Sequence, residues 1–373
     1  MPIAALPEIL TWSEPTDVLA HAHKDYVSLL IGQLGAALAR IAQRDSKLGT
    51  QLLAEIQGLP DAALMRLLLA PRTCNHLLWP ERHSPETTAQ FLSGAARAER
   101  ANLDPATAPK EEVWSALGDV RCCPAEGVQR APRPEGLMPL DFESPFVQII
   151  AAAASTAAAL PAPPRFKTEE RHTILQQFTE TAVQLRSTSE VTFSFVVAYN
   201  KVVVLHKTAG TERFLTRSPE KYIGLAVFRN PQRENVDPVD LAEGLVHEGI
   251  HTVLDIDEYS RQRGGASLGQ WIRDVRLYDG ATRTRSPWTG AALPVHTYLH
   301  ACFVWYGLLH FWALALSKGA FDRARVQERI IAAASGFLRQ QVLDEVAPYR
   351  DVIAPDLLDA VERMQAHVRQ AFG

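Results

Sequence analysis

Apolar side chains recur every three to four positions in several stretches of the chain, which is the spacing of an amphipathic helix. The first stretch covers residues 16–58, and further helices are predicted from Asp61 to Leu69, from Ser84 to Glu99 and from Lys167 to Arg186. Residues 104–147 contain seven prolines, so we expect an irregular crossing segment there.

The middle of the chain has a different pattern, rich in β-branched and aromatic residues. The runs Glu190–Tyr199 and Lys201–Lys207 are separated by a turn signal at Asn200, which predicts a β-hairpin. Tyr222–Phe228 is a third strand candidate. From Pro238 onward the pattern is mostly helical again.

These elements predict an α+β fold that is predominantly helical, with a helical N-terminal half, a small central sheet and a helical C-terminal half. We divide the chain into a helical region at residues 1–186, which could bind a substrate or partner, and a region at residues 187–373. The second region carries the sequence His247-Glu-Gly-Ile-His251, an HExxH motif, so we expect it to be the metal-binding catalytic region. The two regions are expected to pack as one unit.

Composition excludes several functional classes. Hydrophobic residues make up 47% of the chain, enough for a real core, and the 38 Lys and Arg against 42 Asp and Glu argue against nucleic-acid binding. The four cysteines cannot form a disulfide framework, and the N-terminus lacks the pattern of a signal peptide, so we expect a cytoplasmic location. The long apolar stretch Val295–Ser317 carries three histidines, which favours a buried helix over a membrane span.

The strongest chemical signal is the motif His247-Glu248-Gly-Ile-His251, an HExxH sequence within a helical apolar pattern. Side chains four residues apart on a helix stand one above the other, so both imidazoles can bind one divalent ion. Glu248 lies one position around the helix and can also approach the metal.

The third metal ligand would decide the class of site. After Glu258 the chain has no Glu until Glu328, and Glu258 itself could reach back only if the helix broke. Asp255 could bind only with distortion, so the peptidase signatures are incomplete. The best remaining donors are His296 and His300, four residues apart on the apolar helix that starts near Val295.

His300 is the preferred third ligand of these two, whereas His296 could simply line the start of the helix. His310 lies among Leu309, Phe311 and Trp312, which is the environment of a core histidine. A third imidazole on a second helix would leave positions on the metal open for substrate.

Four segments in order resemble a known group of proteins. They are Ile223-Gly-Leu-Ala-Val-Phe-Arg-Asn-Pro, the HExxH motif, Ser286-Pro-Trp, and Leu299-His-Ala-Cys-Phe-Val-Trp. Together they resemble the HExxH-motif peptide-modification proteins, the iron(II)- and 2-oxoglutarate-dependent HExxH-type peptide β-hydroxylases. The motifs cover about residues 215–315.

The resemblance implies iron(II) held by His247, His251 and His300, with 2-oxoglutarate as co-substrate and dioxygen as oxidant. The reaction would hydroxylate a side-chain β-carbon of a peptide or amino acid, commonly in a ribosomally made precursor peptide. One departure matters: the loop Trp288–Pro294 lacks the basic residues that such proteins usually carry there. Arg283 and Arg285, just upstream, are the nearest candidates to bind the free carboxylate of 2-oxoglutarate.

Two other classes stay open. In a zinc-dependent HExxH hydrolase or peptidase, Glu248 would deprotonate a zinc-bound water. In the oxygenase, by contrast, Glu248 would orient a ligand or the substrate. In a non-catalytic scaffold, the histidines would bind a structural ion or none. The sequence indicates neither a membrane partner nor the oligomeric state.

Overall fold

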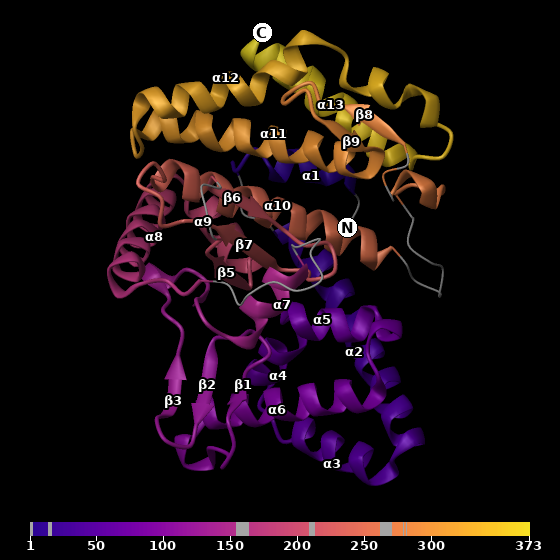
Figure 1. The fold of residues 1–373 in the computed structure, drawn as a ribbon. Helices are drawn as coiled ribbons and strands as arrows, with labels where there is room; N and C mark the ends of the chain where they lie inside the picture. The colour runs from indigo at the N-terminus through magenta and orange to yellow at the C-terminus, as the bar shows by residue number, and fades with distance from the viewer. Residues whose placement is uncertain are drawn as a thin grey trace. The chain divides into compact units, whose positions relative to one another are not determined.

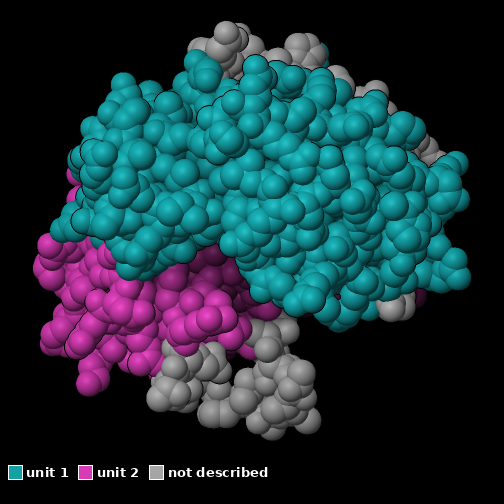
Figure 2. All heavy atoms as spheres, turned by 90° about the horizontal axis from the view of Figure 1, so that it is seen from above, with its two compact units in different colours: residues 1–26, 180–199, 238–373 teal, residues 27–179, 200–237 magenta. Residues whose placement is uncertain are grey.

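The computed structural model describes residues 3–13, 17–153, 164–208, 213–261, 271–278, 280 and 282–373. It confirms the predicted class, a mixed α+β protein that is predominantly helical with small sheets. The chain forms two compact units, both discontinuous in sequence (Figure 2). Unit 1 contains residues 1–26, 180–199 and 238–373, and unit 2 contains residues 27–179 and 200–237. The expected division after residue 186 therefore does not coincide with these units.

Unit 1 is built mainly from long helices, and its α11 packs against both α10 and α12 (Figure 1). Its longer α-helices are α9 (Glu190–Tyr199), α10 (Pro238–Ser260), α11 (Val295–Lys318), α12 (Arg323–Arg339) and α13 (Pro355–Phe372). The remaining elements are η1 (Ile3–Ala5), α1 (Leu6–Ile9), η5 (Val275–Leu277), the hairpin strands β8 (Arg283–Arg285) and β9 (Ala292–Pro294), and η6 (Val342–Tyr349).

Close approach of α10 and α11 depends on Gly307. A Cβ atom at this position would lie 2.6 Å from Cδ1 of Ile250 on α10. The Gly307 carbonyl also accepts a hydrogen bond from the indole N–H of Trp12, at 2.9 Å. The two helices that carry the histidines are therefore held in direct contact along their apolar faces.

Unit 2 combines helices with two sheets. Its helical elements are α3 (Ser46–Gln57), α4 (Asp61–Leu68), α5 (Pro71–Leu78), η2 (Pro80–Arg82), α6 (Pro85–Leu103), η3 (Pro105–Thr107), η4 (Pro134–Gly136) and α7 (Pro145–Ala153). An antiparallel sheet has the order β1 (Val113–Trp114), β2 (Val120–Cys123), β3 (Gly127–Arg130). The second sheet has the order β4 (Leu140–Asp141), β5 (Val202–His206), β7 (Leu225–Arg229), β6 (Leu215–Arg217).

Two of the four sequence boundaries between the units lie inside helices, namely α2 (Asp17–Arg44) and α8 (Thr168–Thr188). The single helix predicted for residues 16–58 is wrong, because the chain leaves helical geometry at Asp45. The Asp45 carboxylate accepts hydrogen bonds from the backbone N–H groups of Lys47 and Leu48, both at 3.0 Å, and so caps the start of α3.

The predicted β-hairpin is also wrong. Residues Glu190–Tyr199 form α9, whose first turn is capped by Ser189: the Ser189 hydroxyl oxygen accepts the Thr192 N–H at 3.1 Å. Without that partner, β5 pairs in parallel with β4 and β7. All five residues of β5 are buried, as is typical of a strand inside a parallel sheet.

The segment expected to be irregular contains short strands as well. Residues 104–147 include β1 to β4, and β2 pairs antiparallel with both β1 and β3. The third strand candidate, Tyr222–Phe228, is shifted in the structure to β7 at Leu225–Arg229.

By length and composition, α11 is the one helix among the described residues that could cross a membrane. However, 67% of its most apolar window is buried inside the structure, and the core helix of a soluble protein meets the same test. Its C-terminus is capped by Gly319, which has a φ of 66°.

Candidate metal centre

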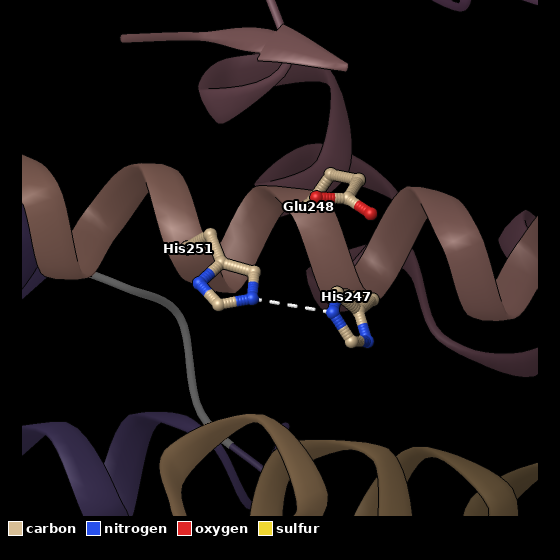
Figure 3. Close-up of side chains that lie close together, drawn as sticks. All are labelled: His247, Glu248 and His251. Atoms are coloured by element: carbon tan, nitrogen blue, oxygen red, sulfur yellow. Dashed lines mark hydrogen bonds between the residues drawn. The ribbon is translucent and has the colours of Figure 1, made fainter. Parts of the chain in front are cut away.

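The HExxH motif lies in the middle of α10, as predicted. Figure 3 shows the imidazoles of His247 and His251 on one side of this helix, one turn apart, with Glu248 on the other side in that view. Their Nε2 atoms are 3.2 Å apart. One carboxylate oxygen of Glu248 lies within 4.8 Å of a ring nitrogen of each histidine.

The spacing of the two Nε2 atoms fits a shared ion. Two nitrogens that each bind a metal at about 2.1 Å are about 3.0 Å apart at a right angle and about 3.4 Å apart at the tetrahedral angle. The observed 3.2 Å falls between these values. The residues His247 and His251 are partly exposed, whereas Glu248 is fully buried.

His300 reaches this motif from α11. Its Nδ1 lies 3.0 Å from Nδ1 of His251, and the two rings stack with centroids 5.3 Å apart. His247 and His300 therefore face different nitrogens of the His251 ring. The structure brings the three predicted ligands together in one row, and the role of His300 as third ligand of the same ion stays a prediction.

Burial and neighbouring rings favour the neutral forms of His251 and His300. Burial lowers the pKa of His251 well below its usual value, and the neighbouring His247 and His296 lower it further. Burial, then His296 and His251, have the same effect on the pKa of His300. A neutral imidazole has a lone pair on one nitrogen, which is the form that binds a metal.

Sequence reasoning undervalued a second group of donors next to the first. Glu258, His296 and His300 offer ligand atoms that all lie within 4.8 Å of one another, and all three residues are buried. Nε2 of His296 is 2.9 Å from Oε2 of Glu258. The hydroxyl of Tyr278 donates to Oε1 of the same carboxylate, and burial, followed by the charge of Glu258, raises the pKa of Tyr278.

Glu258 was set aside because it could not reach back to His247 and His251 along an intact helix. In the structure α10 does stay intact to Ser260, and Glu258 instead meets a different helix. The available signal was the spacing: Glu258 lies two turns beyond His251 on α10, while His296 and His300 lie one turn apart on α11.

Trp271 packs against this second group. Trp271 is fully buried, and its ring centroid lies 5.0 Å from that of His300. The indole N–H donates to Oδ2 of Asp257 at 3.0 Å, and Arg261 donates to the same oxygen at 2.7 Å. These contacts hold the indole ring of Trp271 against the ring of His300.

The remaining predicted residues lie elsewhere in unit 1. Arg283 and Arg285 are on β8, and their side chains are exposed while Thr284 between them is buried. Arg283 donates to the carbonyl of Ala292 in its own hairpin, at 3.0 Å. Because exposed guanidinium groups are well solvated, this placement adds no specific support for their role as 2-oxoglutarate anchors.

Trp288 of the Ser-Pro-Trp segment has a packing role in the structure. Its indole N–H donates to the carbonyl of Ala333 on α12 at 2.9 Å, and its ring stacks with that of Trp305.

His310, expected to be a core histidine, stacks on His367 with ring centroids 4.9 Å apart. It belongs to neither group of donors.

The donors present fit a divalent transition metal. Imidazole nitrogens with a buried carboxylate nearby suit iron, zinc and related ions. Nε2 of His300 is buried without a hydrogen-bond partner in the part of the chain that the structure describes.

No protein-family model matches this chain, and no curated protein is significantly similar to it in sequence.

Proposed function

We propose that this chain is an iron(II)- and 2-oxoglutarate-dependent oxygenase that hydroxylates a side-chain β-carbon of a peptide or amino acid in natural-product biosynthesis. The observation that supports it best is the row of imidazoles on α10 and α11. Nε2 of His251 lies 3.2 Å from Nε2 of His247, as expected for two ligands of one ion, and the other ring nitrogen of His251 lies 3.0 Å from Nδ1 of His300. The four motifs of the sequence resemblance support the same reaction class.

His247, His251 and His300 are the proposed iron ligands. When bound, the metal would supply oxygen activation at positions that the protein leaves open. Burial favours the neutral forms of His251 and His300, and His251 lies between His247 and His300. Glu248, buried beside both histidines of the motif, is proposed to orient a ligand or the substrate.

The co-substrate needs a cation for its distal carboxylate, since a buried carboxylate without a partner is costly. Arg283 and Arg285 remain the proposed candidates for this role. Replacing the anchoring arginine by Gln should weaken 2-oxoglutarate binding about 10-fold or more, because a charge-assisted hydrogen bond contributes about 1.5–3 kcal/mol. Unchanged binding in the double variant would exclude both residues.

The proposed activity can be tested without knowing the substrate. Metal-free protein should take up iron(II) under argon, and adding 2-oxoglutarate should then produce a weak visible charge-transfer band. Admitting oxygen should bleach the band and yield succinate. Bound iron without a band and without succinate would contradict the oxygenase assignment.

A zinc hydrolase is the second candidate, and one observation favours it. The carboxylate of Glu248 is within 4.8 Å of both histidines of the motif, close enough to act on a water at a metal held there. Metal analysis after anaerobic purification separates the two classes, because zinc rather than iron would favour the hydrolase. A non-catalytic scaffold would show neither reaction.

The proposed substrate is a peptide, such as a precursor peptide, or an amino acid. We propose no nucleic-acid or membrane partner, and a cytoplasmic site of action, because the charge is nearly balanced and the cysteines are few. All four cysteines are free thiols in the structure.

A further inference from the structure

The second group of donors differs in kind from the first. It combines one carboxylate, Glu258, with two imidazoles, His296 and His300, from a different helix. Two histidines and one carboxylate form the facial set that commonly binds iron(II) and other divalent transition metals. The i, i+4 spacing of His296 and His300 on α11 repeats the arrangement of His247 and His251 on α10.

All three residues are more than nine-tenths buried. Glu258 is 3% exposed, His300 is 3% exposed and His296 is 8% exposed. Burying a carboxylate is costly unless a cation or several hydrogen bonds compensate for the lost hydration. Tyr278 and His296 supply two hydrogen bonds to Glu258.

An unpartnered nitrogen of His300 is an independent observation that points to a bound ion in this group. Its Nδ1 faces His251, but its Nε2 is buried with no hydrogen-bond partner among the described residues. An unpartnered buried polar atom costs about 1–3 kcal/mol. A metal ion in this group would use that nitrogen.

We propose that Glu258, His296 and His300 bind a divalent transition-metal ion of their own, so that the protein holds two ions side by side. The separation of 2.9 Å between Nε2 of His296 and Oε2 of Glu258 allows both atoms to bind one ion once the ring proton between them leaves. This inference goes beyond the proposed function, which needs only one ion.

The two sites are connected through His300. Its Nδ1 faces Nδ1 of His251, a proposed ligand of the first ion, and its unpartnered Nε2 is the nitrogen left for the second ion. If the ring binds ions through both nitrogens, it does so as an imidazolate, and its last ring proton leaves to solvent. Trp271 packed on the His300 ring limits its rotation.

The test counts ions directly. Full-length protein is stripped of metal, titrated with cobalt(II) under argon, desalted and analysed for metal. We expect two cobalt ions per chain, and one in Glu258→Gln and in His296→Asn. His247→Asn should also retain one ion. His310→Asn, a change of a histidine on the same helix outside both groups, should retain two.

The wild-type count decides the question even if a variant fails to fold. One ion per chain in the wild type would overturn the two-ion inference, and the proposed function would stand if that ion is lost in His247→Asn. No bound ion would contradict both. Two ions that persist in folded Glu258→Gln and His296→Asn would place the second ion elsewhere and also overturn the inference. Circular dichroism and thermal melting of the metal-free variants establish that they fold.

Discussion

Nδ1 of His251 lies 3.0 Å from Nδ1 of His300, although 49 residues separate them in sequence. The contact joins α10 to α11 at the point where each helix carries a pair of histidines one turn apart. It follows from the packing of two apolar helix faces, for which Gly307 provides space.

The first prediction concerns the ligands of the HExxH site. His247→Ala and His251→Ala should each lower the amount of iron that stays bound after desalting by about one ion per chain, because each removes a nitrogen from the first site. His300→Ala removes a ligand proposed for both ions and should lower the bound iron by at least as much. His310→Ala is the control, since it removes a ring stacked on His367 and should lower the melting temperature without lowering the iron content. Full iron binding in His300→Ala would remove His300 from the ligand set.

The second prediction separates the two enzyme classes through Glu248. Glu248→Gln keeps the shape of a fully buried side chain but cannot act as a general base. An oxygenase should still form succinate from 2-oxoglutarate in this variant, whereas a hydrolase should lose almost all turnover. Succinate is measured in single-turnover reactions with iron content as the reference. Loss of succinate with iron fully retained would count against the proposed role of Glu248.

The third prediction is a pH dependence of stability at His310. Burial, with a smaller effect of His367, lowers the pKa of His310 to about 4, while an exposed histidine has a pKa of about 6.5. Between these pH values the unfolded chain binds a proton that the folded chain excludes. The free energy of unfolding should therefore fall as the pH drops from about 6.5 to about 4, and the contribution should be fully present above that window.

Urea unfolding of wild type and His310→Gln at pH 7 and pH 4.5 checks this. Because glutamine does not titrate, the variant should lose less stability between the two pH values than the wild type. Equal losses in both proteins would show that His310 is freely protonated in the folded state.

The fourth prediction tests the packing of Trp288 against α12. A Cβ atom at Gly336 would lie 2.4 Å from Cε2 of Trp288, and the rigid indole is held by its hydrogen bond to Ala333. Gly336→Ala should therefore reduce the free energy of unfolding by about 1–3 kcal/mol.

Gly94→Ala is the matched control for that change. Gly94 also lies within a helix, α6, but nothing stands within 4 Å of the added Cβ. Alanine there should stabilise the protein by about 1 kcal/mol, the difference in helix propensity. Chemical unfolding of both variants gives the comparison, and a neutral Gly336→Ala would show that the indole can move aside.

The sequence by itself determined the helical character of the chain and the placement of the HExxH pair. Both depend on local periodicity: side chains four residues apart share a helix face whatever surrounds the helix. The predicted helices at Asp61–Leu69 and Ser84–Glu99 correspond to α4 and α6 for the same reason. The break between α2 and α3 at Asp45 could also have been predicted from the sequence, since Asp is a preferred residue for capping the start of a helix.

Other features depended on tertiary structure. The run Glu190–Tyr199 is rich in aromatic and β-branched residues, so its pattern does not distinguish a buried helix from a buried strand. Its packing against α10, together with the Ser189 cap, made it a helix. The pairing of β5 with β7 then followed, because a parallel neighbour comes from a distant part of the chain.

The partners of His300 were likewise decided only by the tertiary structure. Spacing along α11 indicated that His296 and His300 share a face, and spacing along α10 placed Glu258 two turns beyond His251. Which of these side chains meet depends on how far one helix is shifted along the other, and no local pattern encodes that shift. The packing of α10 on α11 brought His300 to His251 and Glu258 to His296.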